Sequence, residues 1–237
     1  MGYRTGWAAA ALLLALPAAA ATPSSPQSVS ASYNVLRNGA RVAVMHESFE
    51  AADGSYRIAS ETHAIGLLAL LAPRPLRVTS SGRLSGDGLA PLHFEGKRGE
   101  NDTRQVRAEF DWGEKLLKLQ SSGGNEILPL PPGTQDQLSI MYQFMFLAPD
   151  RPQLLHLSRT NGRKLDQHHY TVRTGVEIKT ALGRIATVHL VMQHQPSESG
   201  VELWLSPQHY YLPMKLLILN NDGARYEQVI TKLEIRP

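Results

Sequence analysis

The sequence contains no cysteine. This absence excludes disulfide bonds, zinc sites with thiolate ligands and cysteine nucleophiles. It also leads us to expect no lipid anchor of the kind that is attached to a thiol. Noncovalent packing must therefore hold the fold together.

Charge is also scarce. Charged residues make up 19% of the chain, and 24 Lys and Arg against 21 Asp and Glu leave a formal charge of +3. A protein that binds a phosphate backbone clusters a much larger basic excess, so no nucleic-acid partner is expected. Hydrophobic residues make up 42% of the chain, which is enough to build a core.

Sequence motifs for catalysis and cofactor binding are missing as well. There is no Gly-x-Ser-x-Gly, no glycine-rich phosphate loop and no His-Glu-x-x-His. The adjacent His168 and His169 would point to opposite faces of a strand, which suits one metal ion poorly. Asp136 is a candidate general base, but the helix dipole favours an acidic residue in the first turn of a predicted helix, and this is the simpler explanation. We therefore predict no catalytic residue, no metal and no cofactor, and favour a protein that is not an enzyme.

Long apolar runs are confined to the N-terminus. An uninterrupted apolar stretch from Ala8 to Leu16 follows the single charge of Arg4, and Pro17 and a run of alanines come after it. A spanning helix needs about 20 apolar residues, whereas this pattern is typical of a secretory signal peptide. We predict a signal peptide over residues 1–21, a linker over 22–30 and a single domain over 31–237. The predicted location is the periplasm, with no transmembrane helix after cleavage.

From Ala31 onward, apolar residues recur at every second position in runs separated by Gly, Asp, Asn and Pro. This pattern is typical of antiparallel strands. Asn38-Gly39 and Asn221-Asp222-Gly223 are hairpin turn signals, since these residues tolerate positive φ. Long helical segments do not separate the runs, which argues against βαβ units. The expected fold is all-β and mainly antiparallel, a barrel or half-barrel with one short helix against the sheet.

Two segments break the strand rhythm. Residues 65–71 are apolar on every side and are compatible with a short helix or with a strand that continues into the core. In residues 130–147, Thr134 followed by Gln137 forms a capping-box pattern, which predicts a helix of about three turns starting at Thr134. The side chains expected to face the sheet are those of Leu138, Met141, Tyr142 and Met145.

Candidate binding residues come from paired side chains on strand faces. Glu177 with Lys179, and Glu202 with Trp204, each share one face of a predicted strand. Pointing inward, such groups would need a partner or a ligand; pointing outward, they would form a surface ion pair and a surface aromatic, which is the simpler arrangement. The complete candidate ligand-binding set is Trp112, Tyr142, Glu177, Lys179, Glu202 and Trp204.

Several short strings occur together in a characteristic order. They are Phe110-Asp111-Trp112, the segment 130–139, the segment 177–183, Glu202-Leu-Trp204-Leu and Tyr211-Leu-Pro213. In this order and spacing the chain resembles, over about residues 30–237, the exported bacterial family known as domain of unknown function 3108. The resemblance implies a periplasmic, β-rich, barrel-like domain and supplies no catalytic residues.

Three functional hypotheses follow. The first is non-catalytic binding of an apolar or amphipathic, lipid-like molecule of the cell envelope, because closing about ten strands leaves an interior that side chains need not fill. The second is an envelope assembly or scaffold protein that binds other envelope proteins through a surface patch of Trp204, Tyr210 and Tyr211. The third is an uncharacterised hydrolase that uses Asp136.

Overall fold

The computed structural model describes residues 25–99, 102–150, 153–195 and 198–237, and the predicted signal peptide lies outside these ranges. The described residues form a single sheet of 15 strands in the order β8-β7-β6-β5-β4-β3-β2-β1-β15-β14-β13-β12-β11-β10-β9. The strands of the first arm are β1 (Ser28–Arg37), β2 (Ala40–Ala52), β3 (Ser55–Ala64), β4 (Leu76–Ser85), β5 (Gly88–Lys97), β6 (Val106–Asp111), β7 (Leu116–Ser121) and β8 (Gly124–Pro129). The strands of the second arm are β9 (Gln135–Asp136), β10 (Leu154–Thr160), β11 (Leu165–Thr180), β12 (Gly183–Met192), β13 (Gly200–Ser206), β14 (Leu212–Leu219) and β15 (Arg225–Arg236).

The two arms meet where β1 pairs with β15, so the first and last strands of the chain lie side by side in the middle of the sheet. All pairings are antiparallel except that between β9 and β10. The sheet does not close, because β8 and β9 are its two edges. The prediction of an all-β, mainly antiparallel half-barrel is confirmed.

The predicted hairpin at Asn38-Gly39 joins β1 and β2. Its two residues have φ values of 51° and 83°, as a two-residue turn with positive φ at both positions requires. The predicted turn before β15 also forms, and Gly223 has a φ of 79°. These local signals therefore fix the pairing of adjacent strands.

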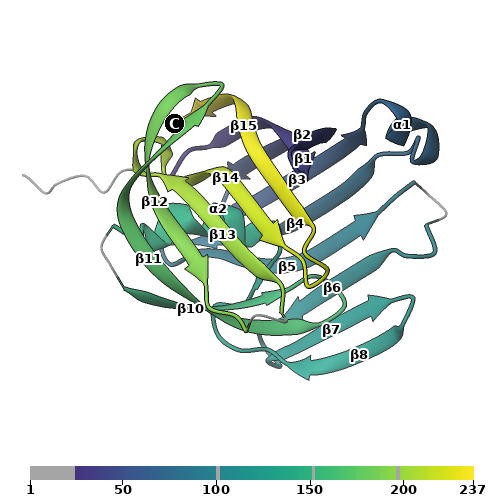
Figure 1. Cartoon of the computed structure of the whole chain (residues 1–237). Coiled ribbons are helices and arrows are strands. Elements are labelled where there is room, and N and C mark those ends of the chain that lie inside the picture. The colour runs from purple at the N-terminus through teal and green to yellow at the C-terminus, as the bar shows by residue number, and fades with distance from the viewer. Residues whose placement is uncertain (1–24, 100–101, 151–152, 196–197) are drawn as a thin grey trace, which may run out of the picture.

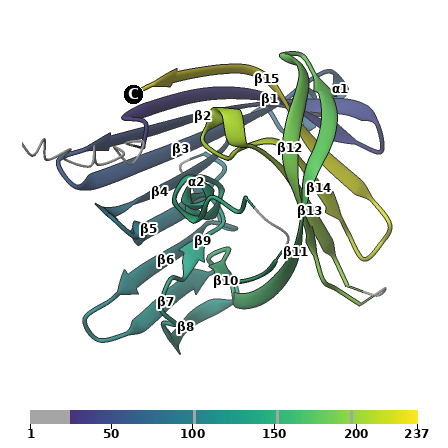
Figure 2. The same cartoon turned by 90° about the vertical axis from the view of Figure 1, so that its left-hand side faces the viewer.

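Helix α2 (Ser139–Leu147) lies on the concave side of the curled sheet, which surrounds it on several sides (Figures 1 and 2). On one side, the ring of Tyr142 stacks on Phe49 of β2 with 5.1 Å between centroids. On the other side, Phe144 is fully buried in a second apolar cluster with Leu190 and Leu203. The helix therefore fills the centre of the half-barrel and packs against both arms.

The prediction that this helix begins at Thr134 is wrong. The helix begins at Ser139, after a turn at residues 137–138 that Asp136 caps. Oδ1 of Asp136 accepts hydrogen bonds from the backbone N–H groups of Leu138 and Ser139, both at 2.8 Å. In return, the Ser139 hydroxyl accepts a bond from the Asp136 backbone N–H at 2.9 Å. A carboxylate is the stronger acceptor, and Thr134 instead donates its hydroxyl to the carbonyl of Pro131 at 2.8 Å.

The side chains expected to face the sheet are only part of the buried surface of α2. Leu138 and Tyr142 are buried, and Met141 and Met145 are half-buried. Residues on the other side of the helix, including Ile140 and Phe144, are buried as well. The reason is that the curled sheet encloses the helix, whereas the prediction assumed a sheet on one side.

Other boundaries also differ from the predictions. Strand β1 begins at Ser28, within the predicted linker. Strands β8 and β9 were not predicted, since most side chains of β8 are exposed and β9 has two residues. Strand β11 is continuous, with a register shift between Arg173 and Val176.

The apolar segment 65–71 forms a short helix, α1 (Leu67–Leu71), in agreement with one of the two alternatives. It has no buried residue and joins β3 to β4 at one end of the sheet (Figure 1). Among the described residues, no helix has the length and apolar character needed to cross a membrane.

Candidate functional site

A cavity of about 190 Å³ lies inside the half-barrel, beside α2. Its walls come from both arms: β2, β3 and β4 of the first arm, and β10, β14 and β15 of the second. Most of the lining is apolar, and the polar side chains include one acid, Glu47, and one base, Arg159. The apolar lining residues are Met45, Leu76, Val78, Leu138, Met141, Leu216 and Ile218.

Glu47 points into the interior because it lies on the same face of β2 as the buried Met45 and Phe49. Its carboxyl accepts a hydrogen bond from the Tyr142 hydroxyl at 3.4 Å and another from Ser60. Burial raises the pKa of Glu47 to about 7, although these two hydrogen bonds lower it. Near neutral pH this carboxyl therefore exchanges a proton readily and can act as a donor or an acceptor.

Arg159 reaches the same cavity from β10, where it follows Leu155 and Leu157 on the inward face. Its Nε atom is buried, and no hydrogen-bond acceptor among the described residues reaches it. No carboxylate of the described chain lies within 4.0 Å of its guanidinium group. Its positive charge acts on the neighbouring Tyr170, whose pKa is raised by burial and lowered in part by Arg159.

The cavity therefore contains two ionisable groups of opposite sign on different walls, without an ion pair between them. An unpaired charge in an apolar enclosure is unfavourable unless a counter-group or water compensates it. The two groups therefore leave hydrogen-bonding capacity in the cavity that the described residues do not fully use.

Asp136, the candidate general base, lies elsewhere and is fully buried. Both of its oxygens are occupied: Oδ1 caps α2, and Oδ2 accepts the Ser80 hydroxyl at 2.6 Å. The Tyr56 hydroxyl lies 3.1 Å from that of Ser80. Burial raises the pKa of Asp136 to about 6. The side chain thus connects α2 to β4, and a substrate would have no path to it in this conformation.

The predicted ligand-binding residues do not come together in one place. Tyr142 is the one that borders the cavity site, through its hydrogen bond to Glu47. Trp112 follows β6 and donates its indole N–H to the carbonyl of Pro91 at 2.7 Å, and it lines a separate, shallow hollow of about 360 Å³.

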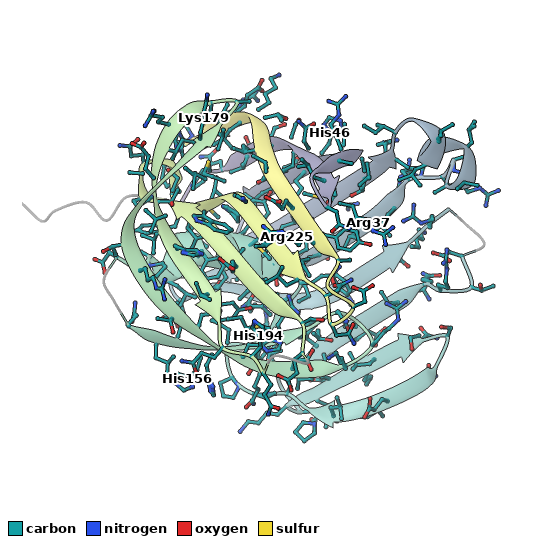
Figure 3. The ribbon with its side chains drawn as sticks, in the orientation of Figure 1. Arg37, His46, His156, Lys179, His194 and Arg225 are labelled. Atoms are coloured by element: carbon teal, nitrogen blue, oxygen red, sulfur yellow. The ribbon has the colours of Figure 1, made fainter. Side chains whose placement is uncertain are left out.

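Glu177 and Lys179 lie exposed on the hairpin of β11 and β12, and neither lines the cavity. Figure 3 shows Lys179 on this hairpin. Glu177 pairs with Arg184 across the hairpin at 2.8 Å. This is the outward arrangement, in which the ion pair contributes under about 1 kcal/mol.

Glu202 and Trp204 also point outward, since Val201, Leu203 and Leu205 of the same strand face α2. The indole stacks on His189 at 4.3 Å between centroids, and Glu202 lies 2.7 Å from the same imidazole. Lys215 lies 4.9 Å above the indole from the next strand. These residues form a row across the outer face of the sheet.

Sequence reasoning missed Glu47 and Arg159. The available signal was a charged residue at an inward position of an alternating strand: Glu47 falls between Met45 and Phe49, and Arg159 continues the period of Leu155 and Leu157.

Comparison with known proteins identifies the family and the fold. The family model described as "Protein of unknown function (DUF3108)" matches residues 28–229. Among solved structures, the chain is similar to a beta-barrel-like protein of domain of unknown function DUF1849 from Brucella abortus, with a TM-score of 0.56 and 11% identity, over 88% of this chain and 97% of that one. At this identity the likeness concerns the fold alone. No curated protein matches the chain.

Proposed function

This chain belongs to the DUF3108 family of proteins of unknown function, and from its inner cavity we propose that it is a non-catalytic periplasmic protein that binds an amphipathic molecule of the cell envelope. The observation that carries this proposal is the buried, unpartnered Nε of Arg159 in a cavity lined by both apolar and polar side chains. The periplasmic location rests on the predicted signal peptide.

The chemistry of the cavity favours an anionic polar end on the ligand. A guanidinium group presents a planar fork of donors that suits carboxylate or phosphate oxygens. Glu47, with a pKa of about 7, can donate a proton to the same oxygens in its neutral form. The apolar residues of β4, α2 and β14 then accept the hydrocarbon part.

The size of the cavity limits how much of the ligand it encloses. Typical small-molecule pockets measure about 300–1,000 Å³, and this one measures about 190 Å³. It therefore accommodates an anionic end with a short apolar segment. Because the sheet is open, a longer chain can extend past the edge strands without breaking the ladder of hydrogen bonds in the middle of the sheet.

Binding of decanoate and of decanol tests the proposal. We expect Arg159→Met to weaken decanoate binding about tenfold or more in calorimetry and to change decanol binding little, because methionine keeps the packing volume and removes the charge. Arg173→Met is the matched control, since Arg173 is exposed on β11 and pairs in register with the outward His189. Native mass spectrometry of protein purified from the periplasm would identify a natural ligand. Absence of any bound molecule together with no decanoate binding would overturn the proposal.

The scaffold hypothesis remains the second candidate. Its proposed patch contains Trp204, which is 9% exposed because His189 and Lys215 cover the indole. Little of the ring is left for a partner, so the patch depends on the half-buried Tyr210 and Tyr211. Crosslinking in intact cells tests this version, which requires that Tyr210→Ala remove at least one crosslinked protein.

A further inference from the structure

The three most exposed large apolar side chains of the described residues lie on α1, beside a fourth exposed leucine. The exposed fractions are 81% for Leu67, 42% for Leu68, 78% for Leu70 and 82% for Leu71. Single exposed leucines are ordinary, but a contiguous group of four is typical of an interaction site.

In α1 the large apolar side chains face solvent and the small side chain faces the protein, whereas a helix that packs on its own core buries its large apolar side chains. The one small residue of α1, Ala69, is half-buried, whereas all four leucines point outward. Leu67, Leu70 and Leu71 therefore contribute little to the packing of this sheet.

The segment is held in place despite its exposure. It begins at Gly66, whose φ of 59° permits the turn out of β3, and Pro73 and Pro75 stiffen the return to β4. Arg98 donates a hydrogen bond from Nη1 to the carbonyl of Arg74 at 3.2 Å. The leucines are thus presented on a braced loop at one end of the sheet (Figure 1).

Basic residues surround the base of this loop. Arg74 is exposed, and within the described ranges no carboxylate lies within 4.0 Å of it. Arg77 shares Glu61 with His63, at 3.4 Å and 2.9 Å. Arg98 lies beside Asp102, whose carboxyl accepts its backbone N–H at 2.6 Å. Among the described residues, the three arginines thus outnumber the two neighbouring carboxylates, Glu61 and Asp102, behind the apolar tip.

We propose that α1 inserts into the surface of a lipid bilayer that contains anionic lipids. The leucines enter the boundary between headgroups and acyl chains, and the arginines behind them contact the lipid phosphates. This inference uses none of the cavity residues and does not depend on the proposed function.

Vesicle binding provides the first test. The natural protein is sedimented with vesicles of phosphatidylethanolamine and phosphatidylglycerol, and separately with phosphatidylcholine vesicles. We expect Leu67→Asp with Leu71→Asp to lower the partition coefficient about tenfold or more on both kinds of vesicle. Arg74→Glu should weaken binding only to the anionic vesicles.

The matched control is Leu182→Asp. Leu182 is a 40% exposed leucine in the turn between β11 and β12, which Figure 1 draws on the opposite side from α1. This variant should bind both vesicles like the natural protein. Circular dichroism of every variant confirms that the sheet is intact, which is expected because no leucine of α1 is buried.

A label at α1 provides a second test that does not rely on loss of binding. Because the chain has no cysteine, Leu70→Cys takes a single environment-sensitive fluorophore. Anionic vesicles should shift its emission to the blue and protect it from an aqueous quencher, whereas the same label at Leu182→Cys should not respond. No vesicle binding by the natural protein, or an unchanged partition coefficient for the double variant, would overturn the proposal. Conversion of a natural dimer to a monomer by the double variant, without vesicle binding, would assign the surface to a second copy of this chain.

Discussion

At the scale of single residues, the interior contains two buried carboxyl groups that differ in how they are satisfied. Asp136 receives three protein donors on its two oxygens, two on Oδ1 and one on Oδ2. Glu47 accepts two side-chain hydroxyls, and its bond from Tyr142 is long at 3.4 Å. The first residue is therefore a structural connection, and the second retains hydrogen-bonding capacity toward the cavity.

Glu47 predicts a pH dependence of stability. Its pKa rises from 4.5 in the unfolded chain to about 7 in the folded protein, so the folded state holds a proton that the unfolded state releases. Stability from this group is therefore present at low pH and is lost as pH rises through about 7. We expect Glu47→Gln to remove this loss, and at pH 8 to raise the free energy of unfolding by up to about 3 kcal/mol.

Urea unfolding at pH 5.5 and at pH 8 measures this effect. The control is Glu50→Gln, since Glu50 lies exposed on the same strand. An equal difference between Glu47→Gln and the natural protein at both pH values would contradict the assignment.

At the scale of elements, α2 depends on a cap that the sequence only partly revealed. Thr134-x-x-Gln137 and Asp136-x-x-Ser139 overlap in the chain, and both fit capping patterns. The structure uses the second one, because Asp136 is fixed at the same time by Ser80 of β4. Contacts that are distant in sequence thus decided between two local signals.

The corrected cap predicts an order of destabilisation. Asp136→Ala leaves the N–H groups of Leu138 and Ser139 and the hydroxyl of Ser80 buried without their acceptor, and it should cost about 2 kcal/mol or more. Thr134→Ala loses one hydrogen bond to Pro131 and should cost about 1 kcal/mol. Thermal denaturation compares the two variants. A larger loss for Thr134→Ala would mean that the helix is capped as the sequence alone suggested.

Elements with strong local patterns could be predicted, and those without could not. The hairpin at Asn38-Gly39 and the alternation of β15 were clear in the sequence. Strand β8 showed no buried face, because it is an edge strand with mostly exposed side chains. Strand β9 forms because Gln135 pairs with Arg159 of β10. A strand of two residues is too short to show an alternating pattern in the sequence.

At the scale of the whole molecule, the sheet order explains why the site could not be read from the sequence. Glu47 and Arg159 belong to different arms, which meet through the pairing of β1 with β15. Neither that pairing nor the curl of the sheet around α2 has a local signal. The fold class followed from periodicity, whereas the cavity depends on how two distant segments close on one helix.

This architecture predicts that the two arms unfold together. Tyr142 of α2 packs on the first arm through Phe49, and Phe144 packs on the second arm with Leu190 and Leu203. Weakening the packing of Phe144 should therefore destabilise both arms, although Phe144 contacts only the second arm. We expect Phe144→Leu to lower the protection of backbone amides against hydrogen exchange in β3 and β4 by the same free energy as in β12 and β13.

Native-state hydrogen exchange with peptide mass spectrometry measures both arms in one experiment. Met145→Leu is the control, because Met145 is half-buried on the same helix and the exchange of Met for Leu conserves volume. If Phe144→Leu lowers protection only in β12 and β13, the arms are separate cooperative units, and α2 belongs energetically to the second arm alone. An equal loss of amide protection in both arms would mean that the helix and the β1–β15 pairing make one cooperative structure. An opening of the cavity large enough to expose Arg159 would then involve the whole molecule.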